Sequence, residues 1–89
     1  MKKPKEIEII LKGCANHRRV QLLLLLAKEP ELNLEQIAEH LDIDFRVASE
    51  HLRRMLAGGL ILKRYRGRHV HHALTSRAKD ILTFLRMLE

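Results

Sequence analysis

Apolar residues recur at helical spacing in the first third of the chain, which predicts two helices. In the first, they stand three, four and seven positions apart and the helix is expected to end near Gly13. Residues 1–5 before it form a basic tail that we expect to be flexible. Asn16 is a suitable cap for a second helix reaching about Lys28, and Pro30 ends it. Leucines at 22–26 make this second helix apolar nearly all round, so it belongs at the centre of the fold.

Two further helices follow with only a few residues between them. Asn33 and Gln36 have capping-box spacing and open a third helix. Asp44 caps a fourth helix, which ends at Gly58-Gly59. At about 100° per residue, the fourth helix has an apolar side and a polar, basic side; the apolar side comprises Ala48, His51, Leu52, Met55 and Leu56, and the polar side Arg46, Ser49, Glu50 and Arg53. Residues 33–58 are therefore predicted to form a helix-turn-helix.

The stretch LILKRYRGRHVHHAL, residues 60–74, has the pattern of two strands around the turn Arg66-Gly67. A hairpin directly after a recognition helix is the wing of a winged helix-turn-helix, and its tip here is Arg66, Gly67 and Arg68. Thr75 or Ser76 caps a last helix over residues 76–88. The expected fold is mainly α with a small β-hairpin: five helices and a two-stranded wing in one domain, residues 1–89.

The first and last helices carry more apolar surface than a chain of 89 residues readily covers by itself. A symmetric homodimer built from these terminal helices is the economical solution. It would place two recognition helices at the spacing of a pseudo-palindromic DNA site. The alternative is that both helices pack on their own core. The residues predicted at the dimer interface are Ile7, Ile10, Leu11, Ile81, Phe84, Leu85 and Leu88.

The net charge of +6 is concentrated in one segment of the sequence. Residues 45–74 contain seven Lys and Arg residues and one acid, Glu50, while the other 59 residues contain ten basic and ten acidic residues. The fourth helix and the wing therefore hold the whole excess, as expected for a site that binds a polyanion. The predicted DNA-binding residues are Phe45, Arg46, Ser49, Glu50, Arg53, Arg54, Arg64, Arg66 and Arg68.

Each of these candidates also has a structural alternative. Arginine can donate two hydrogen bonds to guanine and serine can contact base edges or backbone, but the same residues occur on any solvated helix face. Phe45 could pack on a thymine methyl group or into the core of the domain. Glu50 could accept from cytosine or form an ion pair with Arg46 or Arg53. Arg54, at the edge of the face, is expected to contact phosphate.

The sequence contains no recognisable metal or catalytic motif. His69 and His71 share a strand face but supply only two ligands, so we expect no metal site there and treat His69, His71 and His72 as residues that pack, contact DNA or titrate. His51 is expected to hydrogen-bond within the fold. Cys14 is the only cysteine, which excludes an internal disulfide; it is expected to be a small buried residue, with thiol sensing as the alternative. No enzyme signature is present and no cofactor is expected.

The motifs in order resemble the ArsR/SmtB family of winged-helix repressors. ANHRRVQLL, LEQIAEHLDID, VASEHLRRMLAGGLI and GRHVHHAL are similar to the family's successive segments, with histidines where its wing has tyrosines. The resemblance implies a dimeric DNA-binding transcription regulator with the terminal helices at the interface. The sequence departs from it at both usual metal sites, since LNLEQIAEH has no cysteine and SRAKDILTFLRMLE no histidine. The effector, if one exists, is not identified by the sequence.

The sequence thus predicts a regulator that binds double-stranded DNA at an operator and represses by occupancy. Two other classes stay open: a winged helix that binds RNA, and a protein-interaction module, such as an antitoxin, that uses the apolar terminal helices. The opening MKKPKEIEII lacks the apolar run and cleavage site of an export signal, so the expected location is the cytoplasm. No membrane partner is expected, because the apolar run 22–26 is far too short to span a bilayer.

Overall fold

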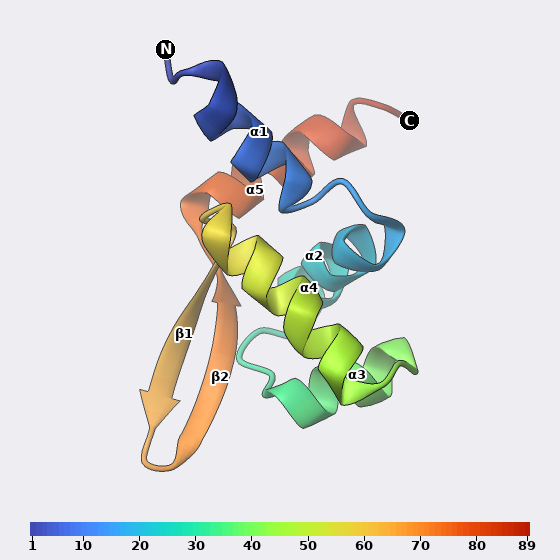
Figure 1. The fold of residues 1–89 in the computed structure, drawn as a ribbon. Coiled ribbons are helices and arrows are strands. Elements are labelled where there is room, and N and C mark those ends of the chain that lie inside the picture. Colours follow the sequence, from blue (N-terminus) through green and yellow to red (C-terminus); the bar gives the residue numbers. More distant parts are fainter.

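A computed structural model describes all of residues 1–89 as five helices and one antiparallel hairpin (Figure 1). The elements are α1 (Pro4–Lys12), α2 (His17–Lys28), α3 (Leu34–Leu41), α4 (Phe45–Ala57), β1 (Ile61–Arg66), β2 (His69–Leu74) and α5 (Ser76–Arg86). The predicted winged helix-turn-helix is confirmed. The predicted flexible tail is wrong in extent, because α1 already begins at Pro4. Proline fits this first helical position because its fixed φ matches the helix and the missing N–H has no partner there.

Side-chain caps set where four of the helices begin, as the sequence indicated. The Asn16 side chain accepts from the backbone amides of Arg18 and Arg19. Asn33 and Gln36 form a complete capping box, each accepting from the other's backbone amide at 2.8 and 2.9 Å. The Asp44 carboxylate and the Thr75 hydroxyl accept from amides in the first turns of α4 and α5. These bonds satisfy donors that a helix start leaves free.

The core forms around α2, which contacts α3, α4, α5 and β2. Leu22 and Leu23 on α2 are fully buried, against the buried Ala48, Leu52 and Met55 of α4. Leu56, predicted on the apolar side of α4, is instead 41% exposed. It lies in the last full turn of the helix and lines the groove between α4 and the wing with Lys63 and Val70.

The turn between α3 and α4 contains no glycine, and Asp42 takes its place. Asp42 adopts a left-handed conformation, with φ of 52°. A short polar side chain tolerates this region better than most residues do. The turn therefore stays as short as the sequence predicted, and Asp44 can cap α4 directly.

The hairpin pairs Ile61 with Leu74 and Arg66 with His69, and it turns through Gly67 at φ of 62°. The loop between α2 and α3 joins this hairpin through a bridge between Leu32 and His72. The His72 amide donates to the Leu32 carbonyl at 2.9 Å, and the Glu31 amide donates to the His72 carbonyl at 3.1 Å. The base of the wing is therefore fixed to the α2–α3 loop.

Helix α1 lies on the C-terminal end of α4 (Figure 1). None of its residues is buried, and the contact is made where Gly58, the residue that caps α4, approaches Gly13 and the end of α1. A β-carbon at Gly58 would lie 3.1 Å from the Ile9 carbonyl oxygen and 3.4 Å from the Gly13 α-carbon. The position of α1 therefore depends on this contact between backbones as well as on the packing of Ile10 against the core.

Replacing Gly58 with valine is expected to displace α1 and lower the free energy of unfolding by ~1–3 kcal/mol, the usual cost of an overpacked contact. Urea denaturation followed by circular dichroism measures the change. Ala27→Val at an exposed position of α2 is the control, since it adds the same side chain where the backbone is helical and no contact is crowded. The two variants would show equal losses if the contact with α1 were unimportant.

Candidate nucleic-acid interface

The outer face of α4 is polar, basic and exposed. Arg46, Ser49, Arg53 and Arg54 are all exposed, while Ala48, Leu52 and Met55 on the opposite face are buried. The helix is therefore anchored by one side and leaves the predicted contact residues accessible. An α-helix presented in this way has the dimensions that the DNA major groove admits.

Glu50 forms ion pairs with two arginines on this face. Its carboxylate accepts from Arg53 at 2.7 and 3.0 Å and from Arg54 Nε at 3.1 Å. Hydrogen bonds from Arg53 and then Arg54 lower the pKa of Glu50 to about 2, so the carboxylate is charged throughout the physiological range. Of the two ion pairs considered for Glu50, the one with Arg53 forms and the one with Arg46 does not.

The side chains of the wing alternate between two faces. Lys63 lies on the face toward α4, where it lines a groove of about 360 Å³ with Ser49 and Arg53. Tyr65, two residues along β1, shares that face by strand alternation and is 72% exposed. Neither residue was predicted as a contact. The alternation of side chains along a strand could have shown that Lys63 and Tyr65 share one face of the wing, but not that this face lies toward α4.

Arg64 and Arg66 lie on the other face of β1 and pair with Glu31. The Arg64 Nε and the Arg66 guanidinium approach the Glu31 carboxylate oxygens at 3.5 and 3.4 Å. Arg64 is thereby set apart from the predicted contacts on α4. The charge count for residues 45–74 also omitted Glu31, which lies outside that range in sequence but against the wing in space.

Apolar side chains are exposed at the start of α4. Phe45 is 57% exposed, so the alternative that it packs into the core is wrong. It lines a wide, open cavity that runs past α3 to Arg68 and His69 at the wing tip. Val47, 45% exposed, is a further accessible residue that the sequence reading omitted.

The wing histidines make contacts with the α2–α3 loop. His71 Nδ1 lies 2.6 Å from the Glu31 carbonyl oxygen, and His72 Nδ1 lies 2.9 Å from that of Leu32. The rings of His69 and His71 are 6.3 Å apart. Nowhere in the chain do three His, Cys, Asp or Glu side chains gather as a metal site requires.

The structure also tests what the sequence predicted for His51 and Cys14. His51 is half-buried but forms no hydrogen bond, so the bond expected for it is absent. Cys14 is half-buried against the core and donates to the Leu11 carbonyl at 3.3 Å. Burial raises the pKa of the Cys14 thiol, with Arg19 partly opposing it. A raised pKa disfavours the thiolate that a reactive sensor cysteine needs.

Burial lowers the pKa of His72, and Lys63 and His71 act in the same direction. Below the ordinary pKa of histidine, the unfolded chain therefore binds a proton that the folded chain resists, so the free energy of unfolding is expected to fall as pH decreases from 7 to 5. Urea denaturation at a series of pH values measures this slope. His72→Gln should reduce the slope, whereas the control His69→Gln, at an exposed position, should keep it. Equal slopes in all three proteins would contradict the assignment.

Helices α1 and α5 expose apolar side chains at the end of the molecule where the two termini lie (Figure 1). Leu11, Phe84 and Leu88 are 50%, 53% and 67% exposed. Of the other predicted interface residues, Ile7, Ile10, Ile81 and Leu85 are half-buried. Two further residues missing from that prediction, Ile9 and Met87, are also exposed. None of the five helices has both the length and the apolar character needed to cross a membrane.

The fold, the exposed basic helix and the adjoining hairpin define a winged helix-turn-helix protein. A family of bacterial regulatory proteins, the arsR family, matches residues 16–63, which is more than half of the chain. The chain belongs to this family of transcriptional regulators, and the resemblance inferred from its motifs is confirmed. A search of curated proteins returned no match.

Solved structures of similar regulators agree with this assignment. The homodimeric winged helix-turn-helix DNA-binding domain of Mb0332 from Mycobacterium bovis, a possible ArsR-family regulator, is 26% identical; the alignment covers 94% of this chain and 78% of that one, with a TM-score of 0.84. HlyU from Vibrio cholerae is 28% identical over 99% of this chain and 97% of its own, with a TM-score of 0.80. A possible transcriptional regulator for arsenical resistance is 28% identical over 85% of this chain and 78% of its own, with a TM-score of 0.72.

Proposed function

We propose that this regulator is a homodimeric repressor that binds a pseudo-palindromic operator and blocks transcription by occupying it. The observation that carries the proposal is the groove between α4 and the wing, which is lined by Ser49, Arg53 and Lys63. It joins an accessible helix face to a basic hairpin, and both can contact one DNA duplex. The membership of the arsR family supports the same function.

The residues of this surface divide by the contact that each can make. Arg46, Ser49 and Arg53 are exposed along the outer face of α4 and suit base edges in the major groove. Phe45 suits a thymine methyl group. The wing tip, with Arg66 and Arg68, suits phosphates or the adjacent minor groove. Arg54 at the edge of α4 is assigned to phosphate and Glu50 to control of its two arginine partners, whereas Arg64, which pairs with Glu31 on the other face of the wing, is left out of these contacts.

A dimer through α1 and α5 supplies the second half of the operator contact. The exposed apolar side chains of these helices need covering, and the similar domain from Mycobacterium bovis is homodimeric. The interface in this proposal comprises Ile7, Ile10, Leu11, Ile81, Phe84, Leu85 and Leu88. A twofold axis there gives two copies of α4 that can enter successive major grooves about 34 Å apart.

Selection of bound duplexes from a random library, at stated salt, tests the proposal. The expected product is an inverted repeat whose half-sites are one helical turn apart. Structured RNA added at the same salt should compete no better than random duplex. Failure to enrich any sequence would contradict the proposal, and stronger competition by RNA would replace it with the RNA-binding alternative.

Arg66→Ala is expected to weaken binding to operator and random duplex alike, because a phosphate contact carries no sequence information. The slope of log affinity against log salt should become shallower by about one unit. Fluorescence anisotropy over a salt series measures both effects. Lys5→Ala on α1, at the opposite end of the molecule from the wing tip (Figure 1), removes the same charge and should leave the slope unchanged. A loss confined to the operator would contradict the phosphate assignment.

A further inference from the structure

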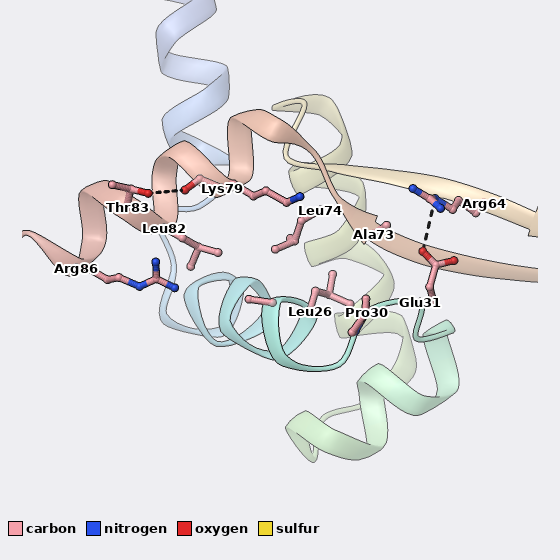
Figure 2. Close-up of a pocket in the computed structure, with 11 residues that line it drawn as sticks. Leu26, Pro30, Glu31, Arg64, Ala73, Leu74, Lys79, Leu82, Thr83 and Arg86 are labelled. Atoms are coloured by element: carbon pink, nitrogen blue, oxygen red, sulfur yellow. Dashed lines mark hydrogen bonds and ion pairs between the residues drawn. The ribbon is translucent and has the colours of Figure 1, made fainter.

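A cavity of about 520 Å³ lies between α2, α5 and the base of the wing, away from the groove assigned to DNA (Figure 2). Its volume falls in the range of small-molecule sites in proteins. Leu26 from α2, Leu74 from β2 and Leu82 from α5 form apolar walls. Three segments far apart in the sequence therefore line an open cavity, in which Leu74 is half-buried and Leu26 and Leu82 are 2% and 4% exposed.

Cations surround this apolar surface with little acid to balance them. Lys79 and Arg86 from α5 line the cavity together with Arg64 from the wing, and the one acidic residue among the lining side chains is Glu31. Figure 2 shows Lys79 and Arg86 on either side of Leu82 along α5. Glu31 pairs with Arg64 and Arg66, so it does not neutralise either cation of α5. The lining carries a net charge of +2.

We propose that this cavity binds a small organic anion with an apolar body, such as a medium-chain or aryl carboxylate. The apolar part contacts Leu26, Leu74 and Leu82, and the carboxylate pairs with Lys79 or with Arg86, which lie on either side of Leu82 (Figure 2). Neutral apolar molecules leave both cations without a partner, and inorganic anions leave the walls uncovered. The apolar side chains and the cations together therefore favour ligands that have both an apolar body and a carboxylate.

The cavity and the exposed apolar surface use different faces of α5. Lys79, Leu82, Thr83 and Arg86 stand at helical spacing and face the cavity. Ile81, Phe84, Leu85 and Leu88 form the neighbouring stripe. A ligand can therefore bind while α5 takes part in the proposed dimer.

Arg64 connects this cavity to the wing. It lines the cavity and also pairs with Glu31, which in turn binds Arg66 near the wing tip. A carboxylate paired with Lys79 adds negative charge on the side of the cavity nearer Arg64 (Figure 2), where it opposes the pairing of Arg64 with Glu31. Loss of the Arg64–Glu31 ion pair is expected to weaken DNA binding when the cavity is occupied. This expectation rests on the proposed DNA-binding function.

Binding is tested without DNA by titrating the ¹⁵N-labelled full chain with sodium octanoate. Saturable shifts of the Leu26, Leu74 and Leu82 amides are expected, and none with octylammonium or acetate at equal concentration. The double variant Lys79→Gln, Arg86→Gln, at two exposed positions, should lose about tenfold or more in octanoate affinity. Lys5→Gln on α1 is the matched control and should bind as the parent does. Shifts that do not saturate, equal shifts with octylammonium, or unchanged affinity in the double variant would overturn the site.

The effect on DNA is measured by anisotropy with the selected operator, at saturating octanoate and at equal sodium chloride. Octanoate is expected to lower operator affinity about fivefold or more. The double variant should bind the operator but no longer respond to octanoate. Saturation of the cavity with no change in operator affinity would overturn the link through Arg64. If the protein bound no DNA at all, the proposed function would fail, and the titration without DNA would still decide the ligand site.

Discussion

Replacing Phe84 and Leu88 with glutamate is expected to separate the proposed dimer and lower operator affinity by about a hundredfold or more. Both side chains are more than half exposed in the single chain, so the substitutions should not unfold it. In the dimer, four added carboxylates would be buried in an apolar interface, where unpaired charges are costly. A monomer would bind one half-site only and would lose the affinity that a dimer gains by binding both half-sites at once.

Sedimentation velocity gives the oligomeric state, and anisotropy with the selected operator gives the affinity. Leu24→Glu is the matched control, since Leu24 on α2 is exposed to the same 53% as Phe84. It should remain dimeric and bind normally. A double variant that stayed dimeric, or a monomer with full operator affinity, would refute the arrangement.

Replacing Arg53 with alanine is expected to cost ~1–3 kcal/mol of discrimination between operator and random duplex, the usual value of a bidentate base contact. Arg53 reaches the exposed surface of α4 but is held there by Glu50 through two hydrogen bonds. DNA must therefore compete with Glu50 for this guanidinium, and only a correctly placed acceptor repays the lost ion pair. In the proposed complex, the Arg53–Glu50 pair would therefore favour the operator over random duplex.

Glu50→Gln separates these two contributions. Without the carboxylate, Arg53 and Arg54 are free to pair with any phosphate, so affinity for random duplex should rise while affinity for the operator changes less. Paired anisotropy titrations at fixed salt give both affinities. Arg53→Ala should instead lower operator affinity and leave random binding nearly unchanged. Equal changes for both duplexes in both variants would show that this face of α4 does not read sequence.

The sequence was sufficient to predict features that depend on neighbouring residues. Caps at Asn16, Asn33 and Asp44 act within one helical turn, and the apolar periodicity of each helix is a local pattern. The fold could be predicted because few arrangements of five helices and a hairpin bury the apolar faces of the helices. The resemblance of the motifs to a known family indicated the same fold. The start of α1 was missed because a proline near a basic terminus was read as disorder.

Contacts between distant segments could not be predicted in the same way. Glu31 stands 33 residues from Arg64 in sequence, and only the Leu32–His72 bridge brings it against the wing. The alternation of Lys63 and Arg64 was readable, but which of them faces α4 depends on how the hairpin packs. The exposure of Leu56 depends in the same way on the groove that remains between α4 and the wing.

The close approach of Gly13 and Gly58 has a mechanical consequence for regulation. Main chain contacts main chain there, so this contact between α1 at the proposed dimer interface and α4 at the proposed DNA-binding face includes no side chain that could change rotamer. In the proposed dimer, each protomer would therefore rotate as a rigid body relative to its partner. A signal could then release the operator in two ways: by rotating the two protomers relative to each other, or by moving the wing, which is not part of the α1–α4 contact.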